Sequence, residues 1–513
     1  MKYIFGFLLV FVYSQSIAQE LVTSNTCAQC HRSDGVVLSV EGEDVSPVGG
    51  WMASVMAFAS QDPYWRAKMA AEVADRPNMK AEIEAECLTC HAPVATAAAR
   101  ADGTPYSREK LEGHALGLDG VTCLSCHRIA PEALGTKAGM SGNFEWVKDE
   151  TVYGPYKDPL QRPMLMHTGF IPRFGTHIES SELCAACHNL DTPIFDANDK
   201  VIGQFPEQTV YSEWLASGYA EAGETCQQCH MPGLSNDSRI ALMPPFARVR
   251  NTVWNHRIVG GNTFLLSLLK YKRDAFGVSR GEFDFEKTIE DTRAFLASAV
   301  ELNLDVQSGP DSVDVVVQLT NLTGHKFPTG YPERRAWLHV RVEDEQGQVV
   351  FESGAVDSLG NIRNETAVMP HRDLINSDRQ VQIYEMIPAN FNGERTRRLL
   401  RVYSKIKDNR LLPNGFREHG SKYSKDVRVV GEAIKDRNFN HEEGSDQVTY
   451  RFAKPLKGSL RVSCELIYQS VPPGAIEDLR RFDGQDVLQF LQIVKNAIPP
   501  MYEVVVNATE IIE

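Results

Sequence analysis

The pattern Cys-x-x-Cys-His occurs five times in the first half of the chain and constrains the fold more than any other feature. Two thiols three positions apart can each form a thioether with one porphyrin, and the adjacent imidazole then lies below the iron as its proximal ligand. The cysteine pairs are Cys27 and Cys30, Cys87 and Cys90, Cys123 and Cys126, Cys184 and Cys187, and Cys226 and Cys229. The proximal ligands are His31, His91, His127, His188 and His230. The repeat predicts five covalently bound c-type haems.

Zinc ribbons and disulfide frameworks are the two alternative explanations of paired cysteines. Neither requires a histidine after every second cysteine, and the intervals between the pairs are too uneven for zinc knuckles. The eleventh cysteine, Cys464, lies in an alternating stretch at 460–468. It is predicted to be a buried, unreactive thiol in a strand.

The N-terminus has the pattern of a secretory signal peptide at residues 1–18. Lys2 precedes an apolar run over 3–13, and the small-residue site ends at Ala18, where cleavage is expected. An uncleaved membrane anchor is the alternative, which the short apolar core disfavours. No later segment is apolar over a length that spans a bilayer, so we expect no transmembrane segment in the mature chain. The protein is predicted to be exported to the periplasm or to the extracellular cell surface.

Charge and length narrow the class of partner. A formal net charge of -14 argues against binding nucleic acid or an anionic membrane and favours encounter with basic redox proteins. About 495 residues remain after cleavage, enough for two or three domains.

The pattern of apolar residues divides the chain into an α+β multidomain protein. Residues 19–276 are predicted to form a pentahaem cytochrome domain of helices and loops, with a long helix over 50–75. Residues 277–302 are predicted to connect the two halves through a helix that runs from about 285 to 302, with Asp284 as its N-cap. Residues 303–513 alternate with the period of strands and predict an antiparallel β-sandwich. Its later strands are expected at 380–384, 396–403, 447–452, 460–468 and 502–508, with one helix near 486–495.

The second axial ligand of each iron decides between an electron carrier and an enzyme, because a second protein ligand closes the iron to substrate. Five histidines outside the motifs lie in segments that favour ligation. They are His114, His167, His177, His256 and His325. For each of them a surface loop or core position is the alternative.

His325 and Met56 have particular consequences as ligands. His325 lies in a loop between two strands of the predicted sandwich, so its ligation would dock the two halves through an iron bond. Met56 would raise the potential of its haem, and a core methionine on the same helix face as Met52 is the alternative.

The remaining polar residues give weaker signals. His339 is predicted on a sheet face, and His371, His419 and His441 lie in polar loops without a ligand pattern. The charged group over 407–410 is best explained by a turn.

Four blocks of the haem half resemble multihaem c-type cytochromes of the cytochrome c-552/c-554 type. They are Trp51-x-x-Ser-x-Met56-Ala with Asp62-Pro63, the site at 86–91, the site at 120–127, and Cys226-Gln-Gln-Cys-His-Met-Pro232. That family usually has a histidine where this chain has Met56. The segments at 324–330 and 407–416 resemble larger multihaem cytochromes that append a sandwich domain. The resemblance implies an exported electron-transfer protein with haems stacked in close pairs.

Two functions remain open, and the number of candidate ligands favours the first. The chain is a relay between a redox donor and a redox acceptor, or it is an oxidoreductase that acts on a small nitrogen or sulfur species at one five-coordinate haem. In the second case the open iron would be the first one, served only by Met56, or the one that lacks His325. A weaker possibility is that the sandwich binds another cytochrome or subunit, with haem-to-haem contact between them.

Overall fold

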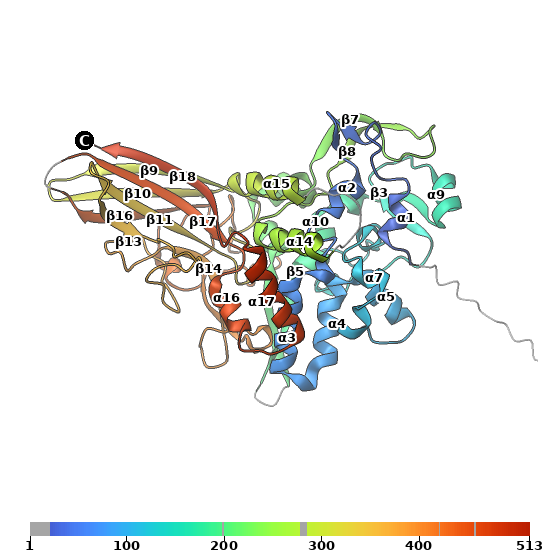
Figure 1. The fold of residues 1–513 in the computed structure, drawn as a ribbon, viewed down its shortest axis with the longest axis horizontal. Coiled ribbons are helices and arrows are strands. Elements are labelled where there is room, and N and C mark those ends of the chain that lie inside the picture. Colours follow the sequence, from blue (N-terminus) through green and yellow to red (C-terminus); the bar gives the residue numbers. More distant parts are fainter. Residues whose placement is uncertain (1–20, 197–199, 277–284, 420, 456–457, 513) are drawn as a thin grey trace, which may run out of the picture.

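A computed structural model describes residues 21–196, 200–276, 285–419, 421–455 and 458–512. The predicted signal peptide and the predicted N-cap Asp284 lie outside these residues. Figure 1 shows the sheets of the C-terminal half on one side of the molecule and the short helices of the haem half on the other. Helices near the middle of the chain and near its C-terminus lie between them.

The helices of the first half are short and follow one another closely. They are α1 (Ser24–Ala28), α2 (Pro47–Met52), α3 (Pro63–Asp75), α4 (Lys80–His91), α5 (Pro93–Ala101), α6 (Arg108–Leu111), α7 (Ala115–Leu118), α8 (Cys123–His127), α9 (Gln161–Thr168), α10 (Ser181–His188), α11 (Val210–Leu215), α12 (Gly218–Ala222), α13 (Cys226–His230), α14 (Thr263–Phe276) and α15 (Phe285–Ala297). Helices α4, α8, α10 and α13 each end at the histidine of a haem motif. Because residues three and four apart share one helix face, this placement presents both thiols and the imidazole on the same side.

The single helix predicted over 50–75 is wrong. The chain forms α2, then turns and the 3-10 helix η1 (Ala59–Gln61), and only then α3. Asp62 caps α3 by accepting from the backbone N–H groups of Tyr64 and Trp65, at 2.8 and 3.1 Å, and Pro63 takes the first helical position. Proline at this position starts a helix because it has no N–H to donate to the preceding turn.

Small two-stranded sheets connect the helices of the haem half. Antiparallel pairs join β1 (Ser39–Val40) to β2 (Glu43–Asp44), β5 (Asn189–Phe195) to β6 (Val201–Thr209), and β7 (Gly233–Arg239) to β8 (Val249–Trp254). A parallel pair joins β3 (Thr151–Gly154) to β4 (Ile171–Phe174). The described 3-10 helices, besides η1, are η2 (Pro77–Met79), η3 (Lys137–Gly139), η4 (Thr176–Glu179), η5 (Leu399–Arg401) and η6 (Glu432–Lys435).

Two sheets form the predicted sandwich. Its strands are β9 (Val300–Ser308), β10 (Ser312–Asn321), β11 (Arg335–Asp344), β12 (Val349–Ser353), β13 (Leu374–Ile375), β14 (Ile383–Ala389), β15 (Ser404–Asp408), β16 (Ser445–Ala453), β17 (Leu460–Gln469) and β18 (Glu503–Ile512). Among the described residues, one sheet has the order β13-β16-β10-β9 and the other β15-β14-β11-β17-β18, with β12 on β11. All pairs are antiparallel except β13 with β16. Val315 faces Tyr450 in the first sheet, and Val340 faces Cys464 in the second.

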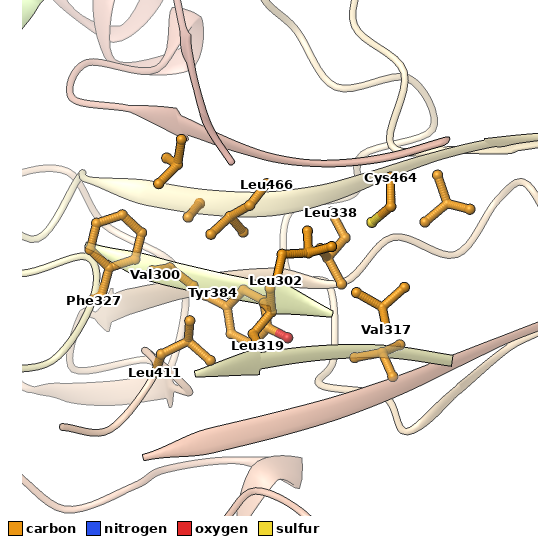
Figure 2. Close-up of a cluster of buried hydrophobic side chains, with 14 of the residues drawn as sticks. Val300, Leu302, Val317, Leu319, Phe327, Leu338, Tyr384, Leu411, Cys464 and Leu466 are labelled. Carbon is orange, nitrogen blue, oxygen red and sulfur yellow. The ribbon is translucent and has the colours of Figure 1, made fainter. Parts of the chain in front are cut away.

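The sandwich core is one continuous apolar cluster between the sheets. Figure 2 shows Leu319 and Val317 of β10 facing Leu338 of β11 and Leu466 of β17. Alternate residues of β10 are buried, as the period-2 pattern of its sequence predicts. Cys464 also points into this core, so its prediction as a buried strand thiol is confirmed. Burial raises the pKa of the Cys464 thiol, which keeps it protonated and unreactive.

One predicted strand of the sandwich is wrong and one is displaced. Residues 396–403 form a loop and η5, and the strand expected at 380–384 runs instead over β14. The side chains of the loop explain why it does not pair as a strand. Arg397 forms an ion pair with Glu333, and Arg398 forms one with Asp478, so these side chains anchor the loop to other segments.

The C-terminal helices return to the haem half. Helix α17 (Gln485–Ala497) is close to the expected helix at 486–495, and α16 (Pro473–Leu479) precedes it. Phe490 and Val487 of α17 share an apolar cluster with Ala67 and Ala71 of α3. No helix in the described ranges is long and apolar enough to cross a membrane.

Candidate haem-binding site

Four of the five motif histidines are held by the same kind of hydrogen bond. The Nδ1–H group donates to a backbone carbonyl: His31 to Ile240 at 2.8 Å, His91 to Ala59 at 2.9 Å, His127 to Tyr153 at 2.5 Å, and His230 to Val259 at 2.7 Å. A carbonyl oxygen can only accept, so the proton lies on Nδ1 and the lone pair of Nε2 is available to a metal. The motif residues therefore fit a haem iron bound on the Nε2 side.

Burial keeps these imidazoles neutral. It lowers the pKa of His91 to about 4 and that of His188 to about 4. The neutral form is the one that binds metal. The proximal side is thus prepared for ligation at neutral pH.

The attachment cysteines of different motifs lie next to one another. Sulfur atoms of different motifs lie beside one another in three pairs: Cys27 with Cys123, Cys184 with Cys226, and Cys187 with Cys90. The first motif is therefore adjacent to the third, and the fourth is adjacent to both the fifth and the second. The spatial order of the motifs differs from their order in the sequence.

His325 of the sandwich half faces the fifth motif histidine. The ring centroids of His325 and His230 are 6.2 Å apart, and the ring planes differ by 18°. A metal–nitrogen bond of about 2 Å on each side, with roughly 1 Å from each nitrogen to its ring centre, separates two trans imidazoles by about 6 Å. The Nδ1 of His325 donates to the carbonyl of Lys326 at 2.9 Å, which leaves its Nε2 free. The structure thus brings together two imidazoles from different halves at the spacing of a bis-histidine iron.

His177 lies near the third motif, and His256 lies near the first and the third. The Nε2 of His177 is 3.1 Å from the carbonyl oxygen of Ile129. His177 packs edge-on against Tyr153 at 4.6 Å between ring centroids, and the carbonyl of Tyr153 holds His127. Burial lowers the pKa of His256 to about 4, with smaller contributions from His127 and His31. The Nδ1 of His256 donates to the carbonyl of Trp254 at 2.7 Å, so its Nε2 is also free.

The other three candidate ligands lie in different surroundings. His114 precedes α7, and its Nδ1 shares a hydrogen bond of 2.8 Å with the hydroxyl of Tyr106. His167 lies in the last turn of α9, where its side chain is exposed. Met56 lies in the turns between α2 and η1, so it does not share a helix face with Met52, and its carbonyl accepts from Val121 N at 3.0 Å.

Trp65 is a contact of the second motif that the sequence did not predict. Its ring stacks on that of His91, with centroids 4.2 Å apart and planes within 8°. Trp65 lies on α3, 26 positions before His91, and helical spacing alone gave no sign of this contact. It restricts the rotation of the imidazole about its own bond to the chain.

His371 lies in a loop, as expected, but its side chain is buried. His371, Asp373 and Asp436 lie close enough to hold a metal ion, with His371 Nε2 2.8 Å from Asp436 Oδ2. However, the amides of Gln382 and Asn409 both donate to Nδ1, at 2.7 and 2.9 Å. An accepting Nδ1 places the proton on Nε2, where it is donated to Asp436. We therefore interpret this group as a structural hydrogen-bond network.

The charged group at 407–410 is also buried, and Lys407 and Asp408 end strand β15 instead of forming the predicted turn. Lys407 Nζ is 3.2 Å from Glu385 Oε1, and Arg410 Nε is 2.8 Å from Asp408 Oδ1. Arg410 Nη1 also reaches Glu213 of α11, at 2.8 Å. These ions connect the sandwich to the haem half.

His339 lies on the sheet face where it was expected. Its two ring nitrogens are 3.3 Å from Glu352 and 3.2 Å from Glu465, on the strands beside it. Burial acts against the charged form, but the two carboxylates raise the pKa of His339 above its ordinary value. It is therefore a member of a sheet-surface ion group rather than of the haem site.

Residues 26–128 match the family described as cytochrome c554 and c-prime. This stretch contains the first three Cys-x-x-Cys-His motifs and is a multihaem domain of that family, as the sequence resemblance predicted. The five motifs and this match are both typical of multihaem c-type cytochromes.

The fold extends this likeness beyond the matched stretch. It is similar to that of a penta-haem cytochrome c552 from Thermochromatium tepidum, with a TM-score of 0.51, 16% sequence identity, and coverage of 96% of this chain and 99% of that chain. The likeness confirms the predicted order of a helical part followed by a β-rich part. No curated protein matches the sequence.

Proposed function

We propose that this chain is an exported pentahaem c-type cytochrome that relays electrons between a respiratory donor and a terminal acceptor. When bound, c-type haems supply one-electron redox chemistry. The residues of the chain would hold each iron and close it to other ligands. This would make the protein a carrier rather than a catalyst.

The facing pair of His230 and His325 is the observation that carries the proposal. The two imidazoles are 6.2 Å apart, near parallel, and each has its Nδ1 bonded to a backbone carbonyl. An iron between them would have both axial positions filled by protein. A closed iron exchanges electrons without binding substrate.

The proposed axial ligands comprise the motif histidines and six other residues. These six are His114, His167, His177, His256, His325 and Met56. His325 has the strongest geometric support, as the partner of His230. His177 lies near the third motif and His256 near the first and the third, and both are proposed for the irons of these motifs.

Adjacent attachment sites support a relay rather than separate centres. The thiol contacts place the first motif beside the third, and the fourth beside the second and the fifth. We propose that the fourth haem is the branch point of the relay. The net charge of -14 favours basic donor and acceptor proteins.

An electron paramagnetic resonance spectrum of the oxidised protein, combined with a haem count, tests this function. We expect five haems per chain and low-spin signals from all of them. In His325→Ala, one haem should become high-spin, while the matched control His339→Ala should keep the full low-spin set. An unchanged spectrum in His325→Ala would remove that residue from the ligands.

An oxidoreductase is the second candidate function. A buried cluster of Tyr64, Tyr331 and Glu207 favours the second haem as the place where a substrate would react. In the described part of the chain, the hydroxyls of Tyr64 and Tyr331 and one carboxylate oxygen of Glu207 are buried without a hydrogen-bond partner. Burial raises the pKa of Glu207 to about 8, so it is a proton donor at neutral pH. Glu207 lies close to Cys87 of the second motif, so we propose the second haem as the site.

The two functions differ in their response to small substrates. If the second iron is open, a stoichiometric high-spin signal should be present and should change when nitrite, hydroxylamine or sulfite is added. Tyr64→Phe should then slow turnover, whereas the control Tyr502→Phe on the sandwich should not. A full set of low-spin signals would exclude the oxidoreductase.

A further inference from the structure

Glu213 is a buried carboxylate on the haem half that binds the segment carrying His325. It lies on α11, between the fourth and fifth motifs, and its side chain is 0% exposed. One carboxylate oxygen, Oε2, accepts from Lys326 N at 3.2 Å and from the Thr329 hydroxyl at 2.5 Å. Both donors belong to residues 322–330, which we call the His325 loop.

The other oxygen of Glu213 is fixed from two sides. Oε1 accepts from the Thr209 hydroxyl at 2.7 Å and lies 2.8 Å from Arg410 Nη1. Arg410 in turn pairs with the buried Asp408. The carboxylate is therefore held in one orientation, and this orientation aims Oε2 at the His325 loop.

A short chain of bonds connects Glu213 to the imidazole. Glu213 holds the N–H of Lys326, and the carbonyl of the same Lys326 accepts from Nδ1 of His325 at 2.9 Å. The position of Lys326 thus determines both how far the His325 imidazole extends from its loop and how the ring is rotated. The ring so placed faces His230 at 6.2 Å.

Burying the charges of Glu213 and Arg410 costs free energy, so we expect this ion pair to do more than stabilise the fold. Removing a carboxylate and a guanidinium from water is unfavourable, and apolar residues of the same volume often stabilise a fold as well or better. The best-attested use of such buried ions is to select one register among several. Here the buried ions would select the position at which the His325 loop contacts the haem half.

We propose that Glu213 is a positioning residue that places His325 on the iron of the fifth motif. Glu213, on helix α11 of the haem half, would thereby determine which residue of the sandwich becomes the distal ligand of this iron. This inference rests on the proposed function, in which His325 is an iron ligand.

Glu213→Gln tests the proposal because it keeps the size of the side chain and removes its charge. We expect one of the five haems to become partly high-spin, and the reduced protein to bind carbon monoxide at up to one equivalent per chain. Added imidazole should restore the low-spin signal. Thr329→Val, which leaves the buried charges intact, should give the same change to a smaller extent and serves if Glu213→Gln does not fold.

Glu72→Gln is the matched control. Glu72 is likewise buried on a helix of the haem half and accepts from two backbone N–H groups of the sandwich half, Leu399 at 3.0 Å and Leu400 at 3.4 Å. It should leave all irons low-spin. If it opens the same iron to the same extent, the effect is one of general docking and the positioning role is excluded.

His325→Ala separates this inference from the function on which it rests. If His325→Ala opens an iron while folded Glu213→Gln and Thr329→Val do not, the positioning role fails and the ligand assignment stands. If His325→Ala leaves every iron low-spin, the ligand assignment itself fails and the role of Glu213 fails with it.

Discussion

The two halves of this protein build their interiors in different ways. The sandwich has one continuous apolar cluster to which strands of both sheets contribute. The haem half has several small clusters instead, and residues of the haem motifs belong to different ones: Leu88 to one and Leu124 to another. Clusters of this size bury too little apolar surface to stabilise a domain by themselves. The sandwich therefore folds on its own side chains, whereas the interior of the haem half would be completed by the haems that we propose are bound there.

Loss of the proposed fourth haem should have the largest effect, and this effect should fall on the haem half. We expect Cys184→Ala with Cys187→Ala to lower the haem count from five to four or fewer. It should also make residues 21–276 sensitive to protease, because the fourth motif contacts both the second and the fifth. Haem quantification with limited proteolysis measures both effects. The control Cys464→Ala should keep the full haem count, and protease resistance of the double variant would contradict the expectation.

A cavity in the sandwich should have a smaller effect, confined to the other half. Leu338 is 0% exposed in the core of the sandwich, and Leu338→Ala should lower its free energy of unfolding by about 2–5 kcal/mol. Denaturant unfolding followed by tryptophan fluorescence measures the loss, and the haem spectrum should stay unchanged below the transition. Val349→Ala, at a position 44% exposed, should cost far less. Equal losses in the two variants would show that the core does not determine stability here.

The smallest expected effect is a dependence of sandwich stability on pH. The pKa of His339 is raised above its ordinary value by Glu465 and Glu352, although burial opposes the charged form. A raised folded-state pKa means that its contribution is fully present below about 6.5, the ordinary value, and is lost as the pH rises through the folded value. His339→Gln should therefore destabilise the protein more at pH 5.5 than at pH 9. Denaturant midpoints at the two pH values measure the difference, and a pH-independent loss would exclude the ionic contribution.

Features encoded by neighbouring residues could be predicted from the sequence. The haem motifs are local, and so is the alternation of β10, in which Val313, Val315 and Val317 all point into the core. The break at Asp62-Pro63 is equally local, and the expected long helix failed because apolar spacing was given more weight than the proline. The loop over 396–403 contains residues typical of strands, but Arg397 and Arg398 are held by distant carboxylates.

Contacts between distant residues could not be predicted. Trp65 on His91 and Glu213 beneath the His325 loop depend on how separate segments pack, and a glutamate on a helix has the same local pattern whether it is buried or solvated. The burial of His371 and of the 407–410 group has the same cause, because their partners come from other strands. The pairing of His325 with a haem motif was expected from its loop, but the motif that it faces is known only from the fold.

The hydrogen bond between His31 and Ile240 has a consequence for how the protein matures. The first motif is the earliest of the five to be synthesised, yet the carbonyl that orients its histidine lies 209 positions later in the chain. The backbone of Cys30 is also held by Leu242, at 2.8 Å. The first haem site can therefore reach its final geometry only after the segment that follows the last motif has been synthesised. The first site to be synthesised is thus among the last to be completed. In a chain truncated before residue 240, His31 would lack the carbonyl that orients its imidazole.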